Sequence, residues 1–93
     1  MFTGKLQRVQ LKFRNDLIGV VIDRFSVDVR IMGDKDSPEH FIAFVEVETS
    51  PLFFGWICGF GKAVEIVSPP VVVKKMGEYV SDIAKMYETH INT

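Results

Sequence analysis

The feature that most constrains this fold is an apolar run interrupted by glycines, residues 51–61. Thr49 or Ser50 can cap a helix here, because a side-chain oxygen placed just before an N-terminal proline accepts a free backbone N–H. Gly59 and Gly61 then end that helix, since glycine readily adopts the conformations that close a helix. The run therefore predicts one short, largely buried helix.

A strand and a long amphipathic helix follow this short helix. Residues 63–67 are typical of a strand, and Ser68 with the two prolines after it begins the last helix. Apolar residues then recur every three or four positions, at Val73, Met76, Val80, Ile83 and Tyr87. This spacing predicts one apolar helix face, which either packs on the domain's own sheet or forms half of a coiled-coil dimer.

The beginning of the chain predicts a strand and a helix. Alternate residues are apolar at Val9, Leu11 and Phe13, which is the pattern of a strand with one buried face. Asn15 or Asp16 can then cap a helix over residues 17–25, whose apolar residues recur at three and four positions. Its many β-branched residues make a strand the competing interpretation.

The middle of the chain predicts a hairpin. Residues 27–32 and 40–48 are typical of strands, and the polar segment 33–39 between them is typical of a turn. The first six elements then have the order β-α-β-β-α-β, which right-handed crossovers fold into one sheet with both helices on one face. We expect an α+β, ferredoxin-like sandwich with an additional C-terminal helix.

Such a sandwich leaves the second face of its sheet open. If the apolar residues of the first strand face the helices, its polar residues face away, as do outward residues of the other strands. This open face would hold Gln10, Lys12, Arg14, Arg30, Ile42, Phe44, Glu46 and Glu48. Mixed charges beside two large apolar side chains predict a contact surface, unless the last helix folds back and covers it.

The composition limits the chain to one domain, residues 1–93, with 47% apolar residues to form a core. A net charge of −1 argues against direct DNA binding by this chain, because such binding needs several Lys or Arg side chains on phosphates. No apolar run is long enough for a membrane span. The single cysteine, Cys58, has apolar neighbours that predict a buried side chain and a reducing, cytoplasmic location.

No catalytic or metal-binding pattern is visible in the sequence. His40 and His90 have no further His or Cys at ligand spacing, and Cys58 has no signature of a thiol nucleophile. A phosphate-binding glycine loop after the first strand is replaced by residues 13–17, where Asp16 would repel a phosphate. We therefore expect no enzyme activity, no metal and no cofactor.

An ordered set of short motifs resembles the C-terminal extension of WYL-domain transcriptional regulators of bacteria. The motifs are Asn15-Asp16-Leu17, Val21-Ile22-Asp23-Arg24-Phe25, Phe53-Phe54-Gly55-Trp56, Gly59-Phe60-Gly61, Val64-Glu65-Ile66-Val67-Ser68-Pro69 and the closing Met86-Tyr87. The resemblance implies a regulatory domain that assists dimer assembly and completes an effector site, and so predicts a homodimer with a small-molecule or nucleotide effector.

In that family a winged-helix domain and a WYL domain precede this one, and both are absent from this chain. The opening residues 1–5 resemble the family's connecting segment, so we expect the chain to be a piece of a longer regulator or a truncated gene product. The family's WYL triplet has no counterpart here. The alternative is a free-standing ferredoxin-like module that binds a small metabolite.

Several residues are candidates for these roles. The ligand-binding candidates are Arg14, Asn15, Arg24, Arg30 and Trp56, and the interface candidates are Ile42, Phe44, Met76 and Tyr79. Three of them also have a structural interpretation: Arg14 as a solvated side chain, Arg24 paired with Asp23 or a nearby carbonyl, and Trp56 as a core residue.

Overall fold

The computed structural model describes residues 6–26 and 28–91 of the chain. The helices and strands are β1 (Leu6–Arg14), α1 (Ile18–Phe25), β2 (Arg30–Gly33), β3 (His40–Glu48), α2 (Pro51–Cys58), β4 (Val64–Ser68) and α3 (Pro70–Ile91). Short 3₁₀ turns precede α1 (Asn15–Leu17) and β4 (Gly61–Ala63). The α+β class, the order of the elements and the additional C-terminal helix agree with the sequence-based prediction.

The four strands form one antiparallel sheet in the order β2-β3-β1-β4. The central strands β1 and β3 pair along their whole length, from Leu6 with Glu48 to Arg14 with His40. The edge strands are shorter and pair with only part of this ladder. One end of the β1–β3 ladder therefore extends beyond both edge strands.

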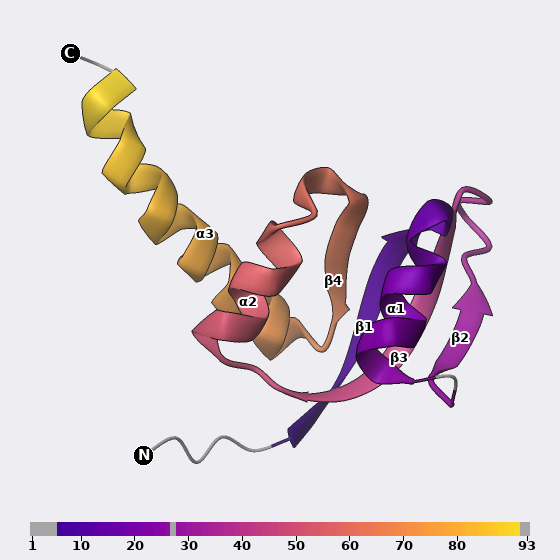
Figure 1. Ribbon diagram of the computed structural model, residues 1–93. Helices are drawn as coiled ribbons and strands as arrows, with labels where there is room; N and C mark the ends of the chain where they lie inside the picture. The colour runs from indigo at the N-terminus through magenta and orange to yellow at the C-terminus, as the bar shows by residue number, and fades with distance from the viewer. Residues whose placement is uncertain (1–5, 27, 92–93) are drawn as a thin grey trace.

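One face of the sheet carries the core. Helices α1 and α2 lie over this face (Figure 1). The buried side chains come from β1, β3 and β4 and from all three α-helices: Val9, Leu11, Phe13, Val21, Phe41, Ala43, Val45, Phe53, Phe54, Ile57, Val64, Ile66 and Val72. The Phe13 and Phe41 rings stack 5.5 Å apart, and the edge of Trp56 meets Phe13 at 6.4 Å. The predicted inward residues of β1 are confirmed.

Helix α2 begins as predicted, with Ser50 as its cap. The Ser50 hydroxyl accepts the Phe53 N–H at 3.2 Å, and Pro51 is the first helical residue. Gly59 follows the helix in a right-handed conformation, and only Gly61 is left-handed, at φ 61°. The prediction that Cys58 is buried is wrong, because Ile57 takes the inward position of the last turn and leaves Cys58 exposed.

The predicted cap of α1 by Asn15 or Asp16 is wrong, because both side chains have other partners. The Asn15 amide donates to the Pro38 carbonyl at 2.9 Å, and the Asp16 carboxylate accepts from Arg14. The chain forms a 3₁₀ turn at these residues before α1 begins. The helical interpretation of the segment itself is confirmed.

Strand β2 begins later than predicted. Ser26 has φ 85° and ends α1, and its carbonyl accepts the Val29 N–H at 3.2 Å. Its hydroxyl accepts the Asp28 N–H at 3.2 Å. These bonds close a turn where a strand was expected, so pairing with β3 starts at Arg30; residue 27 lies outside the described residues.

Helix α3 packs beside β4 and α2 and then runs away from the sheet (Figure 1). Its packing face is rotated from the predicted stripe, because Val72 is fully buried whereas Val73 is exposed. The Tyr79 and Phe54 rings lie 5.6 Å apart, and the Tyr79 hydroxyl lies beside Gly55. Every residue from 81 to 90 is exposed, so α3 does not cover the open sheet face.

The two leucines of β1 give a matched test of the core. Leu11 is 0% exposed and Leu6 is 69% exposed. We expect Leu11→Ala to lower the free energy of unfolding by about 2–5 kcal/mol, because it leaves a cavity among packed side chains. Leu6→Ala should change it by less than about 0.5 kcal/mol. Urea denaturation measures both values, and equal losses would contradict this core.

Candidate functional site

The open face of the sheet carries a row of side chains that crosses all four strands. Arg30 of β2 pairs with Phe44 of β3, Phe44 pairs with Gln10 of β1, and Gln10 pairs with Ser68 of β4. In the next row, Arg8 of β1 pairs with Glu46 of β3. Because side chains alternate between the faces of a strand, these six residues share one face.

A β-bulge brings Ser68 into this row. The register between β1 and β4 shifts between Gln10 and Leu11, so that Leu11 pairs with Ile66 and Gln10 with Ser68. Val67 is passed over by this shift. A bulge commonly redirects a side chain, and here it places a hydroxyl group, in place of an isopropyl group, opposite Gln10.

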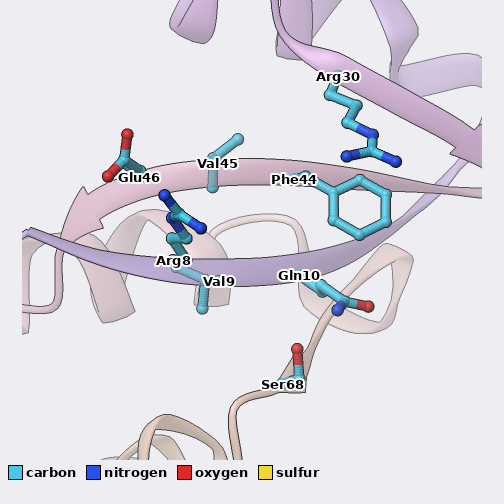
Figure 2. A pocket seen from close by; sticks show the side chains of 8 residues that line it. All are labelled: Arg8, Val9, Gln10, Arg30, Phe44, Val45, Glu46 and Ser68. Carbon is cyan, nitrogen blue, oxygen red and sulfur yellow. The ribbon is translucent and has the colours of Figure 1, made fainter.

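These side chains border a hollow of about 490 Å³. Its lining residues are Arg8, Val9, Gln10, Arg30, Phe44, Val45, Glu46 and Ser68. Figure 2 shows the Arg30 guanidinium against the Phe44 ring, and Gln10 and Ser68 on neighbouring strands. A second hollow of about 310 Å³ adjoins it, where the α1–β2 turn meets Arg30 and Phe44. The first volume lies in the range of ligand sites for small molecules.

The two arginines of the hollow form no ion pair with an acidic residue of the described ranges. The Arg30 guanidinium lies 5.1 Å from the centre of the Phe44 ring, which is a cation–π contact. Arg8 stands opposite Glu46 in the ladder. Neither arginine forms an ion pair with any residue in the described parts of the chain. Their N–H donors are therefore open to an anion.

The other end of the same face is closed by an ion pair. Here the row across the sheet is Met32, Ile42, Lys12 and Glu65. Lys12 Nζ lies 3.3 Å from an Asp34 carboxylate oxygen. The Asp36 backbone N–H also donates to Asp34, at 3.0 Å, and this bond is the main reason that the pKa of Asp34 lies below its ordinary value. The Lys12 ammonium group is thus already ion-paired within the domain.

Of the five predicted ligand-binding residues, only Arg30 lies in the hollow. Arg14 makes a bidentate pair with Asp16, at 2.7 and 3.1 Å, and this bond lowers the pKa of Asp16. Asn15 ties the start of the first 3₁₀ turn to Pro38. The structure places these two side chains at the opposite end of β1 from Arg8, where they hold the chain together locally.

Arg24 and Trp56 form a third group on the helical side of the domain. The Arg24 guanidinium lies 5.2 Å from the centre of the Trp56 ring. The indole is half-buried and also meets the edges of Phe25, at 5.7 Å, and Phe60, at 5.1 Å. Trp56 thus packs against the core, with the arginine over its outer surface.

The four predicted interface residues lie on two separate surfaces. Ile42 and Phe44 are half-buried on the open sheet face. Met76 and Tyr79 are on α3, where they pack partly against the domain's own core. One flat interface cannot use all four residues without moving α3.

Sequence reasoning did not select Arg8 and Ser68 as site residues. Arg8 could have been found, because it stands two residues before the outward-facing Gln10 and so shares its face. Ser68 could not, because the bulge that turns it toward Gln10 leaves no clear signal in the pattern. Glu46 was expected on this face but had no assigned role.

The chemistry of the hollow is that of binding. It offers guanidinium donors, an aromatic ring, one carboxylate, an amide and a hydroxyl group. Within residues 6–26 and 28–91, no three His, Cys, Asp or Glu side chains gather as a metal site would require. In the same ranges, no helix is both long enough and apolar enough to cross a membrane.

The fold and this face define a small α+β domain with a ligand-sized hollow on one side of its sheet. The WCX domain model matches residues 5–84. The chain therefore belongs to the WCX domain family, which is the C-terminal extension of WYL-containing regulators. This confirms the resemblance seen in the sequence and makes the chain a regulatory-type domain associated with WYL transcriptional regulators. A comparison with curated proteins found no match.

The lowered pKa of Asp34 gives a pH-dependent prediction. Its carboxylate should stabilise the fold above the unfolded-state pKa, and this stability should disappear as the pH falls through the lower folded-state pKa. Asp34→Asn should therefore flatten the loss of stability below about pH 4. Because Asp36 provides the main cause, the pKa should stay low in Lys12→Ala. Carbon-13 NMR titration checks this, and an ordinary Asp34 pKa in the parent chain would refute it.

Proposed function

We propose that this domain is a non-catalytic regulatory module that binds a small effector in the hollow on its open sheet face. Two arginines on either side of Phe44, Arg8 and Arg30, support this proposal, because neither forms an ion pair within the part of the chain that the structure describes. Donors left open on a sheet face favour an anionic ligand, because a charged acceptor gives the stronger hydrogen bonds.

Membership of a regulatory domain family supports the non-catalytic part of this proposal. The groups that line the hollow also suit recognition better than chemistry. Its only carboxylate, Glu46, is exposed, and no thiol or imidazole lines it. A general acid or base usually needs burial or a charged partner to bring its pKa near neutrality.

We further propose that the domain forms a homodimer through the outer half of α3. This half carries exposed apolar side chains, among them Val80, Ile83, Met86 and Tyr87, and the Tyr87 ring contacts only the neighbouring His90 of the same helix among the ring contacts of the described residues. Met86 and Tyr87 are 63% and 58% exposed. Such a stripe continues the face that Val72 and Met76 pack on the core, and it favours burial against a second copy.

The family association favours WYL and winged-helix domains, in the same or a longer chain, as partners, and a cytoplasmic location. The net charge of −1 favours leaving DNA contact to such a partner. We also assign the sandwich to the ferredoxin-like architecture, because the element order and the antiparallel arrangement β2-β3-β1-β4 support it.

A free-standing metabolite-binding module is the second candidate, and the hollow itself favours it. Its binding residues all come from the four strands of this one domain. Such a module would need no other domain in order to bind its ligand. If the isolated chain binds its ligand at full affinity, the free-standing module is supported. If binding needs a neighbouring domain, the hollow is part of an effector site that the other domain completes.

Effector binding is tested by native mass spectrometry of the purified chain. We expect a retained small molecule that is lost in Arg30→Ala, because this substitution removes the guanidinium on Phe44. The molecule should stay in the control Lys12→Ala, which removes a cation of the same face that is already paired with Asp34. Retention that does not depend on Arg30 would place the ligand elsewhere.

The α3 dimer is tested by the mass of the chain in solution. We expect a dimer that Ile83→Glu dissociates without unfolding the domain, since this side chain is already exposed. Lys85→Glu is the matched control, because Lys85 stands on the opposite side of α3. Analytical ultracentrifugation measures both. If Phe44→Asp dissociates the dimer and Ile83→Glu does not, the open sheet face is the interface.

A further inference from the structure

The charged side chains of the hollow suggest which class of ligand it accepts. Resting on the proposed effector role of this site, the geometry points to a planar aromatic ring with N–H donors and one anionic group. Mononucleotides and aromatic carboxylates share this chemistry. Arg8, Arg30 and Glu46 together carry one positive charge, which matches a ligand with one anionic group.

The anionic group binds Arg8. Arg8 and Arg30 lie two strands and one row apart in the sheet. With ordinary strand spacing, their Cα atoms are about 12 Å apart. Arg30 is held over Phe44, whereas Arg8 makes no ion pair within the described residues. The two ends of the site therefore differ, and the free guanidinium is the one that suits a carboxylate or phosphate.

The ring binds at Arg30 and Phe44. A guanidinium is flat, and here one side of it is already stacked on an aromatic ring at 5.1 Å. The other side of the Arg30 guanidinium, or the exposed edge of the Phe44 ring, offers a surface on which a ligand ring can stack. Bases and other aromatic rings stack well on arginine and phenylalanine, and this stacking does not require a particular base.

The N–H donors of the ring meet the acceptors that stand around these two ends. Glu46 stands beside Phe44 along β3 and opposite Arg8, yet it forms no ion pair among the described residues. The Gln10 amide and the Ser68 hydroxyl lie in the neighbouring row, which also holds Phe44. The Glu46 carboxylate can accept hydrogen bonds from the N–H groups of a ligand ring. A ligand without such donors would leave this carboxylate unpaired beside the ligand's own anionic group at Arg8.

The dimensions limit the ligand to a small molecule. The hollow has a volume of about 490 Å³, and the Lys12–Asp34 pair closes the face on one side. A polymer of phosphates would need a longer track of cations than two arginines. The chain as a whole has a net charge of −1, which also opposes a polyanion.

The test compares whole ligands with their separate halves. Guanosine 5′-monophosphate and 2-aminobenzoate carry both ring and anion, whereas ribose 5-phosphate has only the anion and guanosine only the ring and sugar. Each is titrated into the purified chain and followed by NMR of the Arg8 and Arg30 side-chain N–H groups. The same titrations use Arg8→Ala, Arg30→Ala and, as control, Lys12→Ala, after each variant's spectrum has shown that it is folded.

We expect at least one complete ligand to bind on the order of tenfold more tightly than ribose 5-phosphate or guanosine. Arg8→Ala and Arg30→Ala should each weaken it by a similar factor, and Lys12→Ala should not. Tighter binding of guanosine 5′-monophosphate would identify a nucleotide, and tighter binding of 2-aminobenzoate an aromatic carboxylate.

Three results would overturn this ligand class. The first is that ribose 5-phosphate binds as tightly as guanosine 5′-monophosphate. The second is that guanosine does so. The third is that no probe shifts the NMR signals of the Arg8 and Arg30 side-chain N–H groups. If native mass spectrometry still finds an Arg30-dependent ligand without an aromatic ring, the ligand class fails and the effector role stands. If it finds none, and no probe binds, both proposals fail.

Discussion

The long antiparallel ladder between β1 and β3 is the interaction on which the other elements depend. Its register puts Val9, Leu11 and Phe13 opposite Val45, Ala43 and Phe41, so one face is apolar over these three pairs and attracts α1 and α2. The same alternation sends charged and aromatic residues to the other face. A slip of one residue would bury the arginines and expose the core, so the fold and the site are fixed by the same pairing.

The site exists because the edge strands are short and differ from each other. β2 contributes a single arginine to the hollow at its first residue, and β4 contributes a single hydroxyl group at its last residue. Beyond them, the two central strands continue and add Arg8 and Glu46. The far end of the face, by contrast, satisfies its lysine with Asp34. Lys12 is therefore paired, whereas Arg8 and Arg30 on the same sheet face form no ion pair among the described residues, because the turn after β2 places a carboxylate near Lys12 only.

The sequence pattern predicted what periodicity controls and missed what single side-chain partners control. The bounds of β3, the Ser50 cap and the outward direction of Phe44 follow from alternation and capping, and the structure agrees with them. The cap of α1 failed because Pro38, far away in sequence, takes the Asn15 amide. The packing face of α3 was predicted to include Val73, but Val72 is the buried residue. Both valines are apolar, so the sequence pattern does not show which of them packs on the core. The position of Ser68 opposite Gln10 could not be predicted, because it depends on a β-bulge.

The projecting helix α3 gives the domain a mechanical property. Residues 81–90 extend about 15 Å as a rigid rod beyond the sheet, while the base of the rod is clamped at Val72 and Tyr79. That base begins two residues after Ser68, a lining residue of the hollow. The direction of this rod is tied to the end of β4, because only Pro69 separates the first residue of α3 from Ser68. A reorientation of α3 at its base would therefore act first on the strand end that holds Ser68 opposite Gln10.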